Sequence, residues 1–130
     1  MASSESTLQN DKNWMAYAIQ LARRGRFTVD PNPAVGSVLV RNDRVLGEGF
    51  HLFAGGGHAE KNCFEQVRLN QVDLNEVKQA TLYVTLEPCC HHGRTPPCTD
   101  VIIAQGVRRV VIGQMDSNRC NWWTEKLVLC

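Results

Sequence analysis

The chain has 130 residues, of which 43% are hydrophobic and 21% charged, and its formal net charge is +1. This length allows one domain with a single core, and the composition is typical of a globular protein. The near-neutral balance excludes a global field that would attract nucleic acid or an anionic membrane, so an anionic ligand would need a local basic cluster.

The sequence shows neither a secretory signal nor a membrane-spanning segment. The first thirteen residues, MASSESTLQNDKN, lack the apolar core of a secretory signal. The longest apolar runs, such as residues 38–40, are too short to span a bilayer. We therefore expect a cytoplasmic protein with no membrane or nucleic-acid partner. In that compartment the six cysteines would stay reduced, and cysteines there more often bind metal or act in catalysis.

The first elements are a polar end and a helix. We expect residues 1–10 to be disordered. Residues 11–24 carry apolar side chains at helical spacing and predict a helix that packs on a sheet. Asn10 or Asp11 can cap its start, and Gly25 can end it.

The rest of the chain predicts a hairpin followed by alternating helices and strands. Residues 35–40 and 44–51 read as two strands joined by a turn at Asn42-Asp43. The next elements are a helix over 58–69, a strand over 80–86, a helix over 99–105 ended by Gly106, and a strand over 108–113. This order predicts an α/β fold, a three-layer α/β/α sandwich with a mixed sheet of four to five strands, the later ones parallel.

Chemistry-bearing residues gather in TLEPCCHHGRTPPCTD, residues 85–100, and in His58-Ala59-Glu60 upstream. A catalytic zinc site takes three protein ligands and leaves the fourth position for water. The candidate ligands are His58, Cys63, Cys89, Cys90, His91, His92 and Cys98. Glu60 is close enough to His58 in sequence to serve that water as a base and then as an acid.

Position along the chain separates these candidates. Cys89 and Cys98 lie at the two ends of the loop, next to a helix start that favours thiolates, and His58 also lies at a predicted helix start. Cys90 can hardly point inward together with its neighbour Cys89. Cys63 lies within a helix on its apolar face and is predicted to be a core residue.

A closed structural zinc site remains an alternative. In that case Cys90 or His91 would supply a fourth protein ligand. Structural sites usually show short paired spacings and have no use for Glu60, which favours the catalytic interpretation.

These residues match a known pattern. H-x-E followed by P-C…C is the zinc nucleobase deaminase signature, whose common form has two residues between the cysteines. This chain has CHHGRTPP between them. The enlarged loop, together with PNPAVGSVLV (31–40), GEGFH (47–51), AGGGHAE (54–60) and GVRRVV (106–111), closely resembles the deaminase domain of the bifunctional riboflavin-biosynthesis enzymes. The resemblance covers about residues 14–116.

The resemblance implies a cytidine-deaminase-like fold and a hydrolase that uses zinc. Zinc would be held by His58, Cys89 and Cys98, with Glu60 as the proton shuttle. The residues that would meet the substrate are Asn32 for the pyrimidine, and His51, His91 and Arg94 for the ribose phosphate. The implied reaction is hydrolytic deamination of the diamino-ribosylamino-pyrimidinone 5′-phosphate of riboflavin biosynthesis, with release of ammonia.

Two other functions are alternatives to this one. A nucleoside or nucleic-acid deaminase predicts the short P-C-x-x-C spacing and, for nucleic acid, a basic stripe with aromatics, and the chain shows neither. A catalytically impaired zinc-binding remnant is the other alternative. It gains support from the abnormal end of the sequence. Cys90 also stands where the family usually has a small residue, which adds a thiol beside the metal.

Residues 117–130 depart from the family pattern. We expect a deaminase domain over 11–116, an atypical tail over 117–130, and no reductase domain. Trp122-Trp123 must be encoded TGGTGG, which reads as Gly-Gly one base later. We therefore hypothesise that the tail is a frameshifted or truncated end of a longer gene. Self-association into a homo-oligomer is the default expectation for such a chain.

Overall fold

The computed structural model describes residues 4–24, 35–50, 59–85, 98–113 and 127–129. The elements are α1 (Ser4–Arg24), β1 (Gly36–Arg41), β2 (Arg44–Phe50), α2 (Ala59–Leu69), α3 (Leu74–Val77), β3 (Thr81–Val84), α4 (Cys98–Gln105), β4 (Arg109–Ile112) and β5 (Leu127–Leu129). The order of helices and strands up to β4 agrees with the predicted order, apart from the short helix α3.

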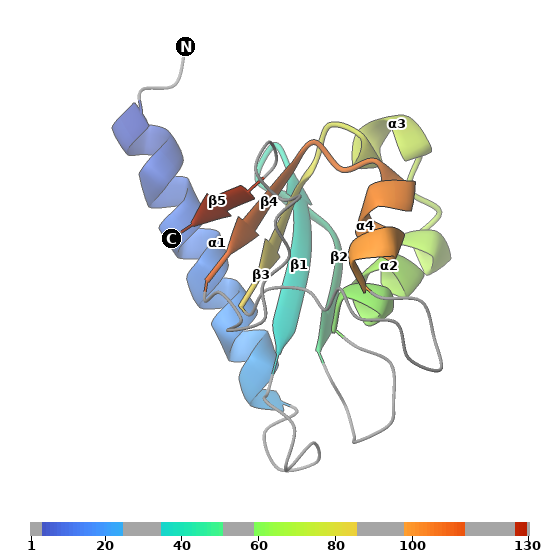
Figure 1. Ribbon diagram of the computed structural model, residues 1–130, viewed down its shortest axis with the longest axis horizontal. Helices are drawn as coiled ribbons and strands as arrows, with labels where there is room; N and C mark the ends of the chain where they lie inside the picture. Colours follow the sequence, from blue (N-terminus) through green and yellow to red (C-terminus); the bar gives the residue numbers. More distant parts are fainter. Residues whose placement is uncertain (1–3, 25–34, 51–58, 86–97, 114–126, 130) are drawn as a thin grey trace.

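The strands form one mixed sheet in the order β2-β1-β3-β4-β5 (Figure 1). Strand β1 pairs antiparallel with both β2 and β3, whereas β3, β4 and β5 run parallel. The predicted mixed sheet with parallel later strands is therefore confirmed.

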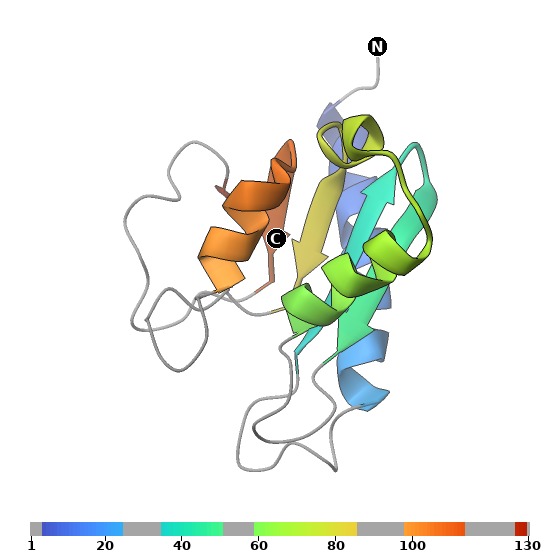
Figure 2. The ribbon, with the colours of Figure 1, turned by 90° about the vertical axis from the view of Figure 1, so that its right-hand side faces the viewer.

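Helices cover both faces of this sheet. Helix α1 lies on one face, and α2 and α4 lie on the other (Figure 2). The strands show why, because successive side chains point to opposite faces. Val38, Tyr83 and Val111 belong to the core cluster on the α1 side. Their neighbours Leu39 and Leu82 belong to the cluster that includes α2 and α4. The three-layer prediction is confirmed.

The β1–β2 hairpin turns at the predicted residues. Asn42 and Asp43 both have positive φ, 51° and 60°, and Arg41 pairs with Arg44 on either side of them. Two consecutive left-handed residues are what a two-residue hairpin loop requires, and Asn and Asp tolerate that conformation better than most residues. The turn chemistry is thus written into the sequence.

Glycines let the helices approach the sheet closely. A Cβ atom on Gly36 would lie 2.1 Å from the Ala18 carbonyl oxygen of α1. On the opposite face, a Cβ atom on Gly47 would lie 2.5 Å from the Val67 Cγ2 atom of α2. Side chains at these positions would push α1 and α2 away from the strands.

The start of α1 differs from the prediction. The helix begins at Ser4, so the expectation that residues 1–10 are disordered is wrong for residues 4–10. The early turns gain a side-chain hydrogen bond from Gln9 to Asn13, four residues apart, at 3.1 Å. Asp11 is therefore an interior residue of the helix and not its cap.

Gly106 ends α4 as predicted. It has a φ of +73°, and its N–H donates to the carbonyls of Ile102 and Ile103 at 3.2 and 3.0 Å. This left-handed glycine just after the last helical residue is a common helix terminator. The corresponding expectation for Gly25 falls outside the described residues.

Part of the segment that the sequence marked as atypical joins the sheet. Residues 127–129 form β5 and pair in parallel with β4, with Val110 opposite Leu127. None of the described helices combines the length and apolar character needed to cross a membrane.

Candidate active site

One edge of the sheet gathers the ends of four strands. Gly36 begins β1 opposite Phe50, the last residue of β2. Ser37 pairs with Val84 at the end of β3, and Val84 pairs with Ile112 at the end of β4. Ligands of open α/β sheets commonly bind beyond such strand ends.

The predicted site residues belong to the segments attached to this edge. Glu60 and Cys98 lie within the described part of the chain, as residues of α2 and α4. The others lie outside the described residues: Asn32, His51, His58, Cys89, His91 and Arg94. Within the described part, no group of three or more His, Cys, Asp or Glu residues could hold a metal.

Glu60 lies in the first turn of α2 and is only 3% exposed. Cys63, Phe64 and Val67 follow it at helical spacing and are buried as well. Glu60 is thus on the face of α2 that is turned away from solvent. The N-terminal end of a helix favours an anion, because its unpaired N–H groups carry a partial positive charge.

Cys98 is the first residue of α4. This helix connects the parallel strands β3 and β4, so it runs back along the sheet and begins on the side where β3 ends. Both α2 and α4 begin on this side (Figure 2). The helix start predicted for Cys98 is confirmed, and such a position favours a thiolate.

This donor chemistry fits zinc. Thiolate, imidazole and carboxylate are the groups that zinc binds or that serve its water. Glu60 and Cys98 stand in the first turns of two helices that begin at the same end of the sheet (Figure 2).

Cys63 is a core residue, as predicted. It is fully buried in the core cluster of α2 and α4, and its Sγ donates to the Gly47 carbonyl at 3.4 Å. Burial raises the pKa of the Cys63 thiol to about 12. The thiol is neutral at physiological pH, as the prediction of a core residue requires.

Hydrogen bonds hold the first turn of α2 in place from two strands. The Ser37 hydroxyl, on β1, donates to the Ala59 carbonyl at 2.9 Å. The Asn62 side-chain amide donates to the Phe50 carbonyl of β2 at 2.8 Å. Neither bond could be predicted from the sequence, because a bond to a distant main-chain carbonyl leaves no spacing signal.

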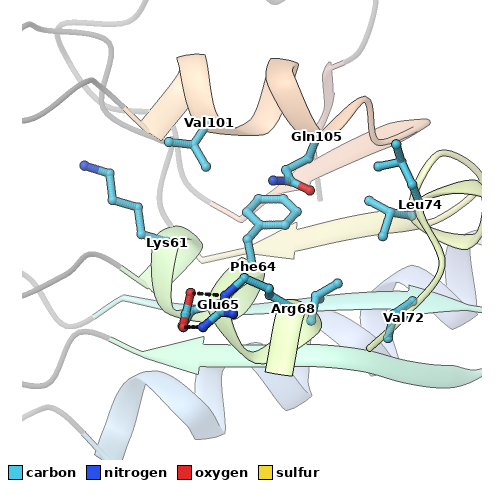
Figure 3. A pocket seen from close by; sticks show the side chains of 10 residues that line it. Lys61, Phe64, Glu65, Arg68, Val72, Leu74, Val101 and Gln105 are labelled. Atoms are coloured by element: carbon cyan, nitrogen blue, oxygen red, sulfur yellow. Dashed lines mark hydrogen bonds and ion pairs between the residues drawn. The ribbon is translucent and has the colours of Figure 1, made fainter. Parts of the chain in front are cut away.

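A separate hollow of about 370 Å³ lies between α2, α3 and α4 (Figure 3). Phe64 of α2 and Val101 and Gln105 of α4 point into it (Figure 3). Glu60 is not among its lining residues. This hollow is therefore distinct from the predicted catalytic position.

A second hollow, of about 290 Å³, lies at the opposite end of the strands, beside the β1–β2 turn. Asp11 forms part of its wall and bonds both Tyr83 and Arg109. The contacts of Asp11 join α1 to the sheet, so they have a structural purpose.

Comparison with known proteins shows the family to which this chain belongs. Residues 8–114 match the family described as the cytidine and deoxycytidylate deaminase zinc-binding region. The match spans most of the chain, including Glu60 and both described helices at the site. The chain belongs to this zinc-binding deaminase family.

Individual relatives share the same region. The riboflavin biosynthesis protein RibD of Escherichia coli (strain K12) is 51% identical over 108 residues, which are 83% of this chain and 28% of that protein. A diaminohydroxyphosphoribosylamino-pyrimidine deaminase of Buchnera aphidicola subsp. Schizaphis graminum is 45% identical over 108 residues, 83% of this chain and 69% of that protein. The chain therefore spans less than a third of the E. coli relative.

A solved structure shows the same similarity. The crystal structure of a diaminohydroxyphosphoribosylaminopyrimidine deaminase/5-amino-6-(5-phosphoribosylamino)uracil reductase from Thermotoga maritima is 51% identical, with a TM-score of 0.77. The matched region covers 83% of this chain and 30% of the Thermotoga maritima chain. The resemblance stated from the sequence is thereby confirmed.

Proposed function

We propose that this chain catalyses the hydrolytic deamination of the diamino-ribosylamino-pyrimidinone 5′-phosphate intermediate of riboflavin biosynthesis. Water replaces the exocyclic amine, and ammonia is released. The observation that carries the proposal is the 45% identity to the Buchnera deaminase, of which the chain covers 69%. The long loop of residues 85–100, which distinguishes this pattern from the short deaminase signature, supports it.

The proposed zinc ligands are His58, Cys89 and Cys98. Two thiolates and one imidazole leave the site near neutral, and zinc bound there supplies the Lewis acidity that lowers the pKa of a water molecule. The first turn of α4 brings Cys98 to the edge where β3 ends, and β3 leads into the segment that contains Cys89.

Glu60 is the proposed proton shuttle. A carboxylate oxygen of Glu60 takes a proton from the attacking water and delivers it to a ring nitrogen of the pyrimidine. Glu60 then takes the proton of the hydroxyl that the water has left on the ring carbon and passes it to the leaving amine, which departs as ammonia while the carbonyl forms. Its burial at 3% exposure supports this role, because a carboxylate screened from bulk water exchanges protons with the substrate in preference to solvent.

Four residues are proposed to bind the substrate. Asn32 would hold the pyrimidine, and His51, His91 and Arg94 would hold the phosphate dianion. An arginine fork with flanking imidazoles suits a phosphate. This local cluster would meet the anion that the near-neutral net charge of the chain does not attract.

Ammonia release from this intermediate, measured with the zinc-loaded protein, tests the proposal. Cytidine and deoxycytidylate serve as competing substrates in the same assay. Glu60→Ala should keep its zinc and lose activity by about 10²–10⁴-fold or more, the usual effect of removing a general acid–base. A protein that binds zinc but releases no ammonia from the intermediate contradicts the proposed activity.

A further inference from the structure

The hydrogen bond from Ser37 to Ala59 lies at the residue that precedes Glu60, the proposed proton shuttle. Ser37 is fully buried, and its hydroxyl donates to the Ala59 carbonyl oxygen at 2.9 Å. That carbonyl belongs to the peptide group that joins Ala59 to Glu60. The bond therefore fixes the plane from which the Glu60 main chain and side chain depart.

Strand β2 holds the same turn from the other side. The Asn62 amide donates to the carbonyl of Phe50 at 2.8 Å. A Cβ atom on Gly49 would lie 2.5 Å from both the Ala59 oxygen and the Cys63 nitrogen. The main chain of β2 thus lies against the first turn of α2 with no space for a side chain between them.

Secondary structure does not require either side-chain bond. The helix offers the Ala59 carbonyl a main-chain donor four residues later. The ladders that pair β1 with β2 and β3 are formed by main-chain groups and need neither the Ser37 nor the Asn62 side chain. The Ser37 and Asn62 side chains are additional, and both act within the turn that carries Glu60.

We propose that Ser37 and Asn62 are positioning residues that hold the Glu60 carboxyl at its working geometry. They act through the main chain of the first turn of α2, and neither touches the substrate. The inference rests on the proposed function, in which Glu60 moves the protons. Catalytic groups must be held within about 0.5 Å of the productive position, and a 1 Å displacement can lower a rate by about 10²-fold.

The direct test compares Ser37→Ala and Asn62→Ala with the wild type, in kcat and KM for ammonia release per bound zinc. We expect kcat to fall by about 10- to 100-fold while KM stays within about twofold, because the displaced group acts in the chemical step. Ser37→Thr keeps the hydroxyl and should retain kcat within about threefold of the wild type.

Asn70 supplies a matched control. Its side-chain amide donates to the Leu46 carbonyl of β2 at 3.2 Å, just beyond the far end of α2. Asn70→Ala and Asn62→Ala lose the same kind of bond to the same strand, so each should lower Tm by about 4 °C. Only Asn62→Ala should lower kcat.

A double-mutant cycle separates positioning from general destabilisation. If Ser37 acts through Glu60, Ser37→Ala should cause no further loss of kcat in a Glu60→Gln background. An equal loss in both backgrounds overturns the inference. So does an unchanged kcat in Ser37→Ala, or an equal fall of kcat in Asn62→Ala and Asn70→Ala. A zinc-loaded wild type that releases no ammonia overturns the proposed function, and this inference with it.

Discussion

The Asp11 carboxylate joins helix α1 to two strands of the sheet. Both terminal N–H groups of Arg109, on β4, donate hydrogen bonds to this carboxylate, and the Nη1–Oδ1 distance is 2.9 Å. The Tyr83 hydroxyl of β3 donates to the same carboxylate at 2.7 Å. The Asp11 side chain is 4% exposed and that of Arg109 is 27% exposed. This network is the buried ionic contact that we expect to stabilise the α1 face.

Asp11→Ala removes the acceptor for both partners. Breaking a fully buried pair costs about 3–5 kcal/mol, because the remaining charge is left without a partner. Arg109 is 27% exposed, so water can solvate part of it. We therefore expect a loss of about 2–3 kcal/mol in the free energy of unfolding and a fall in Tm of about 10 °C.

Urea unfolding of the zinc-loaded protein, followed by circular dichroism, measures this loss. Glu65→Ala is the control, because it breaks an exposed ion pair. The Glu65 side chain is 54% exposed and that of its partner Arg68 is 69% exposed. That variant should lose less than about 0.5 kcal/mol, as exposed helix pairs do. Equal losses in Asp11→Ala and Glu65→Ala would refute the reasoning from burial.

Three further predictions follow from packing, burial and metal binding. Gly36→Ala should lower the free energy of unfolding by about 3 kcal/mol or more, because its Cβ would lie 2.1 Å from the Ala18 oxygen. Gly106→Ala meets no atom closer than 3.6 Å and should lose only about 1 kcal/mol for its positive φ, so equal losses in urea titrations contradict this. Cys63 should resist thiol reagents at pH 8 in the folded protein. Its pKa is raised from 9.0 to about 12, so the stability linked to the neutral thiol is fully present below pH 9 and falls as the pH rises from 9 toward 12. Labelling at the unfolded rate would contradict that burial. Removing zinc with a chelator should abolish ammonia release, and added zinc should restore it; activity that survives metal removal contradicts the zinc mechanism.

Local patterns in the sequence were sufficient for most of the elements. Asn42-Asp43 predicted the hairpin turn, and Gly106 predicted the end of α4, because each depends on a backbone conformation that few residues tolerate. The hairpin followed by alternating helices and strands predicted the layered fold. The prediction of Glu60 as the proton shuttle is also local, since its spacing from His58 is part of a known pattern.

The start of α1 was predicted wrongly for a physical reason. Asp11 belongs to a residue type that commonly caps helices, which makes it a candidate cap in the sequence. In the fold its carboxylate bonds Arg109, a residue 98 positions later in the chain, and the helix continues back to Ser4. A polar residue within a helix is explained only by the strand that it meets.

By itself, the sequence determined the alternation of helices and strands, the chemistry available at Glu60 and Cys98, and the family resemblance. Only the tertiary structure decided what holds Glu60. Ser37 is 22 positions from the carbonyl it binds, and the side chain that Gly49 lacks would have met α2. Such contacts join residues that folding brings together, so they depend on the packing of β1 and β2 against α2 and follow no local spacing.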